Sequence, residues 1–240
     1  MTGLTDLASI SDIDAAVSGT TVPQLFVDLV ARHGSGPALH AMNEGGGWTD
    51  YTFDDYATKV AQAASGLSAA GLGTGDRMLL MLRNVPDFHW FDAAAQFLRA
   101  TPVSIYNSSS PEEIQYLASH AEAEIAVLEN EHFLNGMLQV RADLPALKKI
   151  YVVHPPAGEL PDGVFPASDL LMSGQADLAV LAATTKPDDL ATLIYTSGTT
   201  GPPKGVMISQ YNVVYAIEML KRSLASTFPD FTGLRTVSYL

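Results

Sequence analysis

The sequence predicts an α/β fold with a mostly parallel sheet flanked by helices. Short apolar runs that suit buried strands alternate with segments whose apolar residues recur at helical spacing. Between residues 77 and 153 this strand–helix order repeats, which favours parallel strands joined by crossover helices. The composition supports a large core, because 47% of the 240 residues are hydrophobic and only 16% are charged.

The first elements are a helix, a strand pair and a second helix. Residues 23–33 place apolar side chains on one helical face, and residues 37–42 and 48–51 flank a run of three glycines that suits a turn. Thr52 is a capping residue for the second helix, which Gly71 ends. The buried stripe of that helix comprises Phe53, Tyr56, Val60, Ala64 and Leu67.

The alternating part of the chain follows. Ser110-Pro111-Glu112-Glu113 carries a capping residue, a proline at the first helical position and an acid at the third, which indicates a helix start. Residues 154–162 and 174–189 read as connections. The predicted strands are 77–82, 102–106, 124–128 and 149–153, and the predicted helices between them are 88–98, 110–121 and 133–141.

Three divisions of the chain follow from this pattern. We expect an N-terminal extension over residues 1–20, a first α/β subdomain over 21–185, and the start of a second subdomain over 186–240. The apolar run 235–240 reads as part of a strand.

Charge and cysteine content exclude several functions. The formal net charge is −13, from 26 acidic and 13 basic side chains, so a nucleic acid polymer is not an expected partner. Thiol catalysis and thiolate metal sites are excluded because the chain has no cysteine. The N-terminus lacks a basic segment before an apolar one, and no apolar run suits a membrane span, so we expect a cytoplasmic protein.

One segment concentrates groups that bind phosphate. The strand-like run at residues 190–195 leads into Thr-Ser-Gly-Thr-Thr-Gly-Pro-Pro-Lys-Gly at 196–205. Glycines let backbone N–H groups converge on an anion, hydroxyls donate hydrogen bonds, and Lys204 adds a positive charge. The pattern is not that of P-loop NTPases, in which Gly-Lys-[Ser/Thr] closes the loop, because Lys204 lies between Pro203 and Gly205. The alternative is an ordinary polar surface loop.

The string YTSGTTGPPKGV at 195–206 resembles the signature phosphate-binding loop of the adenylate-forming (AMP-binding) superfamily. Two further segments resemble bacterial long-chain fatty-acid–CoA ligases, namely GLGTGDRMLLML with the following Arg83-Asn84-x-Pro86, and PVSIYNSSSPEEIQY at 102–116. The resemblance implies the N-terminal part of the adenylate-forming enzyme fold.

The resemblance also implies a two-step reaction. A fatty acid carboxylate attacks the α-phosphate of ATP to give acyl-AMP and pyrophosphate, and coenzyme A then displaces AMP. Thr196 would also reach a Mg²⁺ ion. The residues that would hold the β- and γ-phosphates are Thr196, Ser197, Gly198, Thr199, Thr200, Gly201 and Lys204.

In the family, the adenine and ribose sites, the hinge and the catalytic lysine lie downstream of this loop. The resemblance therefore implies a truncated N-terminal portion that lacks the C-terminal catalytic domain, holds no catalytic residue and is inactive alone. The missing part of the chain is an expected partner. Because the substrate would be a lipid, the aromatic cluster Phe88, Trp90 and Phe91 allows a peripheral membrane contact, although core packing is its ordinary role.

Three alternatives stay open. A fatty acyl-AMP ligase would pass its product to a carrier protein, and a peptide-synthetase adenylation domain would activate another acid. From a different class, a non-catalytic nucleotide-binding module would hold ATP without reacting it.

Overall fold

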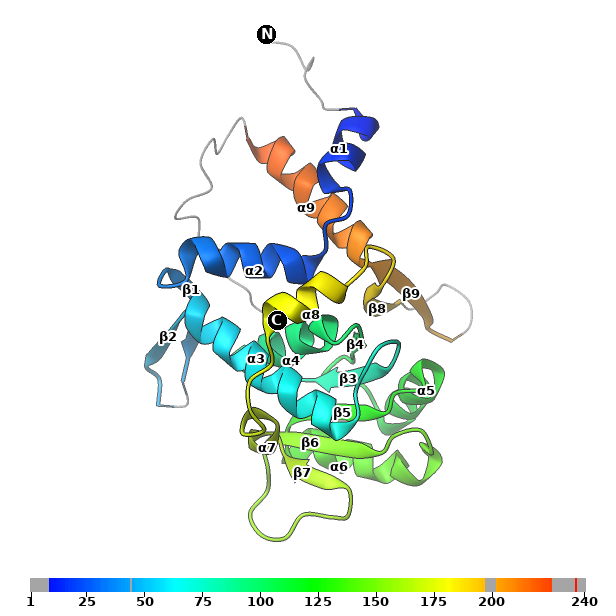
Figure 1. Ribbon diagram of the computed structural model, residues 1–240. Coiled ribbons are helices and arrows are strands. Elements are labelled where there is room, and N and C mark those ends of the chain that lie inside the picture. Colours follow the sequence, from blue (N-terminus) through cyan, green and yellow to red (C-terminus); the bar gives the residue numbers. More distant parts are fainter. Residues whose placement is uncertain (1–8, 44, 197–201, 226–235, 237–240) are drawn as a thin grey trace.

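The computed structural model describes residues 9–43, 45–196, 202–225 and 236 of the chain. Within them the strands form a two-stranded sheet, β1-β2, and a seven-stranded sheet in the order β7-β6-β5-β3-β4-β8-β9 (Figure 1). The strands are β1 (Pro37–Met42), β2 (Trp48–Thr52), β3 (Arg77–Met81), β4 (Thr101–Ser104), β5 (Ile125–Asn130), β6 (Lys149–His154), β7 (Val164–Pro166), β8 (Leu190–Thr196) and β9 (Lys204–Ser209).

Helices connect these strands. They are α1 (Ile10–Val17), α2 (Val22–His33), α3 (Phe53–Ala70), α4 (Pro86–Phe97), α5 (Pro111–Ala121), α6 (Glu131–Val140), α7 (Ser168–Leu171), α8 (Leu178–Thr184) and α9 (Gln210–Leu224), with a short 3₁₀ turn at Arg141–Asp143. In the large sheet every described pairing is parallel except that of β8 with β9. The predicted fold class, a mostly parallel sheet flanked by helices, is therefore confirmed.

The sheet lies between two layers of helices because successive side chains of a strand point to opposite faces. Leu79 and Met81 of β3 pack in one core with α5 and α6. Met78 and Leu80 of the same strand pack in a second core with α3 and α4. Gly66 lets α3 approach α7 closely, because a Cβ there would lie 2.1 Å from the carbonyl oxygen of Leu170.

Two predicted helix starts and one predicted helix end are confirmed. The hydroxyl of Thr52 accepts a hydrogen bond from the N–H of Asp55 at the start of α3, and Ser110 does the same for Glu113 at the start of α5. Gly71, at the end of α3, has a φ of 104°, which glycine adopts without strain. These caps fix where each helix begins, and α5 proves important for the site.

Several elements depart from the sequence prediction. The expected connection at 174–189 contains α8, because the carboxylate of Asp177 accepts hydrogen bonds from the first N–H groups of that helix. β7 and α7 follow the predicted loop at 154–162, and β4 ends at Ser104 rather than at residue 106. Helices α1 and α9 were also not predicted.

Those two helices pack against each other, beyond one end of the sheet (Figure 1). Ile13 and Val17 of α1 share a small apolar core with Val214 of α9. Trp90 and Phe91 are buried, so these two aromatic side chains pack in the core. No helix in the described ranges is long and apolar enough to cross a membrane.

Two predictions are not tested by this architecture. The division of the chain at residues 20 and 185 stays a prediction. The strand expected at 235–240 lies, apart from Thr236, outside the described residues.

Candidate functional site

The candidate phosphate-binding loop joins β8 to β9. These strands pair antiparallel up to the end of β8 and the start of β9, where Thr196 and Lys204 lie directly opposite each other. Both side chains are exposed. Of the seven predicted phosphate-binding residues, the structure therefore brings these two together. The other five, Ser197, Gly198, Thr199, Thr200 and Gly201, lie outside the described residues.

β8 ends with Thr196 at the carboxyl edge of the parallel sheet. Leu193 of β8 pairs in parallel with Val103 of β4, and the hydroxyl of Thr192 donates a hydrogen bond of 3.0 Å to the carbonyl oxygen of Pro102. Ligands of open α/β sheets bind outside the carboxyl ends of the strands. The position of Thr196 and Lys204 thus fits an anionic ligand at this edge.

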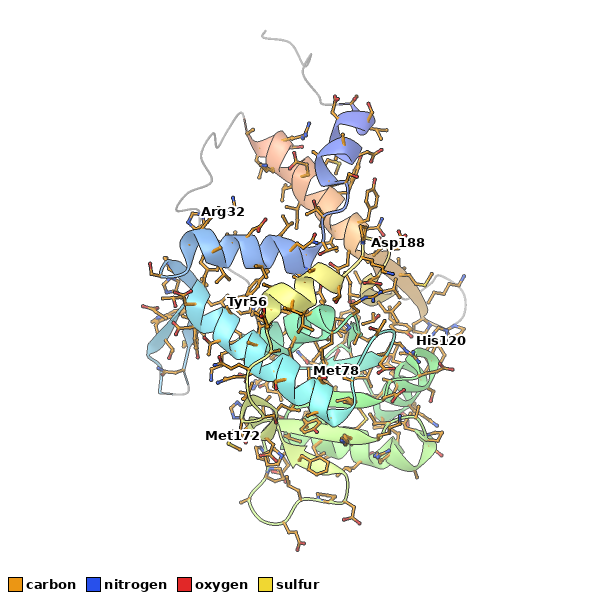
Figure 2. All side chains as sticks on the ribbon, in the orientation of Figure 1. Arg32, Tyr56, Met78, His120, Met172 and Asp188 are labelled. Carbon is orange, nitrogen blue, oxygen red and sulfur yellow. The ribbon has the colours of Figure 1, made fainter. Side chains whose placement is uncertain are left out.

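Helix α5 contacts both arms of the loop. The hydroxyl of Tyr195, which precedes Thr196, shares a hydrogen bond of 2.8 Å with Nδ1 of His120. The hydroxyl of Tyr116 donates a hydrogen bond of 2.8 Å to the carbonyl oxygen of Pro203, which precedes Lys204. Figure 2 shows His120 at the side of the molecule on which β8 and β9 lie. Sequence reasoning missed both residues, because the contacts span 75 and 87 positions.

An ion pair holds the other end of β8. The guanidinium of Arg99 donates two hydrogen bonds, of 2.7 and 2.9 Å, to the carboxylate of Asp189. The carboxylate also accepts a bond of 2.8 Å from the backbone N–H of Lys186. Burial acts to raise the pKa of Asp189, but the hydrogen bonds from Arg99 and Lys186 outweigh it, and the net pKa is lowered. The carboxylate therefore stays charged and fixes the start of β8.

A chain of amides joins α9, the helix after the loop, to the rest of the protein. Buried Gln210 donates to the side-chain oxygen of Gln96 at 3.1 Å, and Gln96 donates to the carboxylate of Asp92 at 2.8 Å. The side-chain oxygen of Gln210 accepts a bond of 3.0 Å from the N–H of Val22. Burial raises the pKa of Asp92 to about 6, although its hydrogen bond to Gln96 acts in the opposite direction.

A second charged cluster lies at the same edge, between the ends of β3 and β5. Arg83 donates to the carboxylate of Glu129 from its backbone N–H at 2.6 Å and from Nε at 2.8 Å. The Glu129 side chain is only 1% exposed. Burial acts to raise the pKa of Glu129, but the hydrogen bonds and charge of Arg83 outweigh it and lower the pKa. Arg83 and Glu129 satisfy each other's charge and hydrogen bonds, so the role of this pair is to join two strand ends.

The donor set suits phosphate better than a bare metal ion. Among the described residues, no group of three or more His, Asp or Glu side chains could hold a metal ion. Thr196 offers a neutral hydroxyl, and Mg²⁺ commonly completes its coordination with substrate phosphates and water. Thr196 together with a bound polyphosphate therefore fits Mg²⁺.

A model of a protein family described as AMP-binding enzyme matches residues 26–240. The chain belongs to this family, and the resemblance noted in the sequence is confirmed. A long-chain-fatty-acid–CoA ligase, ACSBG2, from Xenopus laevis is 32% identical over 85% of this chain and 28% of its own length. The ligase FadD15 from Mycobacterium tuberculosis is 31% identical over 72% of this chain and 28% of its own length.

Solved structures confirm the fold. An acetoacetyl-CoA synthetase from Streptomyces lividans matches 85% of this chain and 32% of its own, with a TM-score of 0.72 and 20% identity. A long-chain-fatty-acid-CoA ligase, FadD1, from Archaeoglobus fulgidus matches 87% of this chain and 40% of its own, with a TM-score of 0.69 and 19% identity. The chain thus spans less than a third of the length of the curated relatives cited above.

Proposed function

We propose that this chain holds the β- and γ-phosphates of ATP in an AMP-forming long-chain fatty-acid–CoA ligase. The observation that carries the proposal is the pairing of Thr196 with Lys204 at the carboxyl edge of the sheet. Family membership and the names of the relatives support the reaction class and the fatty acid substrate.

In the proposed reaction, a carboxylate oxygen of the fatty acid forms a bond to the α-phosphorus of ATP. The bond from that phosphorus to the bridging oxygen breaks, and pyrophosphate leaves with its electron pair. The thiolate of coenzyme A then attacks the acyl carbonyl, and AMP leaves as the thioester forms. The first step moves negative charge onto the departing pyrophosphate.

The residues of this chain act on that charge. The ammonium group of Lys204 neutralises part of it, and the hydroxyl and backbone groups of residues 196–201 are proposed to donate hydrogen bonds to the phosphate oxygens. Mg²⁺, when bound, would neutralise further phosphate charge, and the Thr196 hydroxyl is its proposed protein ligand. None of these groups is a nucleophile, so the contribution is positioning and electrostatic stabilisation.

The finer points of the function also remain proposals. Coenzyme A is the proposed acceptor, the cytoplasm the proposed location, and a membrane-peripheral contact the proposed route to a lipid substrate. The complete protein should form acyl-CoA from a long-chain fatty acid, ATP and coenzyme A. Acyl-AMP that accumulates and moves only to a carrier protein would favour the fatty acyl-AMP ligase.

Calorimetric titration of the chain with Mg–ATP and with magnesium pyrophosphate tests the phosphate site directly. Lys204→Ala should weaken binding of both by about tenfold or more, because a charge-assisted hydrogen bond to phosphate is lost. Lys221→Ala is the matched control, since it removes an exposed lysine from α9 whose ion-pair partner is Glu218. Equal affinities for wild type, Lys204→Ala and Lys221→Ala would contradict the phosphate site.

The reaction itself is tested by ATP–pyrophosphate exchange with a long-chain fatty acid. In the protein expressed from its complete gene, Lys204→Ala or Thr199→Ala should lower kcat/KM for exchange by about tenfold or more. We expect the 240-residue chain alone to show no exchange. Binding of Mg–ATP without exchange in the complete protein would instead support a non-catalytic nucleotide-binding module.

A further inference from the structure

We propose that Tyr116 and His120 are positioning residues that set the distance and direction between Thr196 and Lys204. This inference rests on the proposed function of the loop. Neither residue belongs to the loop, and both lie on α5, a separate helix that contacts one arm of the loop through each of them. The name α5 clamp is used below for the side chains of Tyr116, His120 and Tyr195 together with the backbone carbonyl of Pro203.

The first arm of the loop is held through Tyr195. Its hydroxyl meets Nδ1 of His120 at 2.8 Å, and the two rings pack edge to face with centroids 5.6 Å apart. Tyr195 is mostly buried, and its ring belongs to the apolar core shared with α5 and α6. Because Thr196 is the next residue, the packed position of the Tyr195 side chain fixes the backbone from which the Thr196 hydroxyl projects.

The second arm is held through Pro203. Its carbonyl accepts the hydrogen bond of Tyr116, one residue before Lys204. Tyr116 and His120 lie four positions apart on α5, so they share one helix face, and their rings are 5.6 Å apart. One face of one helix therefore contacts the residue that precedes each of the two described site residues.

The two arms also contact each other beneath the clamp. Tyr195 lies opposite Gly205 in the β8–β9 pairing, and a Cβ at Gly205 would come within 3.3 Å of the Tyr195 ring. A glycine at 205 thus lets the ring lie across the neighbouring strand. This fits an arrangement in which the tyrosine ring, the histidine and the glycine backbone form one packed unit.

A clamp is needed here because β9 has little other support. It is the edge strand of the sheet, its pairing in the described residues is with β8 alone, and none of its residues is fully buried. An edge strand has no ladder of hydrogen bonds on its outer side, so side-chain contacts add to what its single partner strand provides. Helix α5 supplies such contacts close to the loop, and the Ser110 capping box fixes the start of that helix.

The experiment removes one clamp contact at a time. Tyr116→Phe deletes the hydroxyl that reaches Pro203, and His120→Leu deletes the group that meets Tyr195. His120→Asn is the conservative variant, because its side-chain amide can place a hydrogen-bonding group near the position of Nδ1. Tyr211→Phe is the matched control, since it removes a tyrosine hydroxyl that bonds the carboxylate of Asp14 at 2.5 Å.

Two measurements follow in each variant. Calorimetry gives the dissociation constant for magnesium pyrophosphate, and exchange in the protein expressed from its complete gene gives KM for ATP and kcat separately. Tyr116→Phe and His120→Leu should each weaken pyrophosphate binding and raise the KM for ATP by about three- to tenfold, the usual effect of losing one neutral hydrogen bond. His120→Asn should recover most of the loss, and Tyr211→Phe should change neither value.

The controls distinguish the positioning role of the α5 clamp from the phosphate site on which the inference rests. If Lys204→Ala loses affinity while Tyr116→Phe and His120→Leu keep the wild-type values, the α5 clamp has no positioning role and the phosphate site stands. A loss in Tyr211→Phe as large as in the clamp variants would mean that general loosening, not positioning, explains the effect, and would overturn the inference. If Lys204→Ala also keeps the wild-type affinity, the phosphate site and the positioning role fail together.

Discussion

The centre of the large sheet and its β9 edge are built differently. β3 and β5 are buried along almost their whole length, between helices on both faces. In β8 only Ala191 and Tyr195 are buried, and in β9 no residue is. Ile194, Val206 and Met207 of the hairpin are exposed apolar side chains. One continuous sheet thus changes from a packed core into a lightly covered edge that carries the candidate site.

Different forces hold the two regions. The central strands and their helices are stabilised mainly by apolar burial, which is large and has no directional requirement. The β8–β9 hairpin and α9 bury few apolar side chains, chiefly Ala191, Tyr195 and Val214, and directed polar contacts add to their attachment. These contacts include Arg99–Asp189, Gln210–Gln96 and the α5 clamp. Substitutions in the two regions should therefore affect stability and binding separately.

The largest expected effect on stability is in the central region. Phe91 of α4 is 0% exposed and packs in the second core, so Phe91→Ala should lower the free energy of unfolding by about 3–5 kcal/mol. Met207→Ala in β9 is the comparison, because the Met207 side chain is 67% exposed, and it should change stability by less than about 0.5 kcal/mol. Urea unfolding followed by far-ultraviolet circular dichroism measures both. Similar losses in the two variants would show that the hairpin is as tightly integrated as the core.

The sequence predicted the central region well, because its signals are local. The runs that become β3, β5 and β6 are apolar and short, and the caps of α3 and α5 lie next to the helices they start. Short helices were missed where their support is distant. α1 has only eight residues and packs on α9, about two hundred positions away, although Ser9 and Asp12 form a capping box at its start. α8 did have a local signal, Asp177 before an apolar run.

The residues of the candidate loop could be predicted from the sequence, whereas the residues that contact the loop from other elements could not. The glycines, hydroxyls and Lys204 predict a phosphate-binding segment from the sequence alone, because that chemistry needs those residue types close together. The contacts of Tyr116 and His120 depend on β8 lying beside β4, a strand order that alternating patterns do not determine. The ion pair of Arg99 with Asp189 spans 90 positions, so local sequence patterns do not predict it either.

A smaller effect is expected at the attachment of β8. Asp189→Ala should lower the free energy of unfolding by about 1–3 kcal/mol, because Arg99 would keep a partly buried charge without its partner. The pKa of Asp189 is lowered from its ordinary value of 3.8, so the ion pair contributes fully above pH 4 and is lost as the pH falls through the folded-state pKa. The difference between wild type and variant should therefore shrink in strong acid.

Urea unfolding at pH 7 and in strong acid measures this difference. Asp188→Ala is the matched control, because Asp188 is the exposed neighbouring acid and forms no ion pair within the described residues (Figure 2). It should leave stability at pH 7 nearly unchanged. A loss in Asp188→Ala equal to that in Asp189→Ala would attribute the effect to the backbone turn and not to the ion pair with Arg99.

The smallest effect, of opposite sign, is expected at Asp92, where the amide chain from α9 enters the central region. Burial raises its pKa from 3.8 to about 6, so the folded state favours the protonated acid, and stability decreases as the pH rises from about 4 through 6. Asp92→Asn keeps an oxygen to accept from Gln96 and removes the charge. The substitution should stabilise the protein by about 1 kcal/mol at pH 7 and should have no effect at pH 4. The expected gain is smaller than the pKa shift of Asp92 alone implies, because the side chain retains some solvent contact.

Thermal or urea unfolding of the two proteins across pH 4 to 7 gives this dependence. Asp28→Asn is the matched control, since it removes one negative charge from an exposed position on α2 and so corrects for the overall acidic charge of the chain. A gain in Asp92→Asn that is absent near pH 4, grows as the pH rises through 6 and exceeds the control would establish that the attachment of α9 includes a buried charge with an energetic cost. Equal pH dependence in wild type and Asp92→Asn would mean that the carboxylate is fully solvated and that the amide chain carries no such cost.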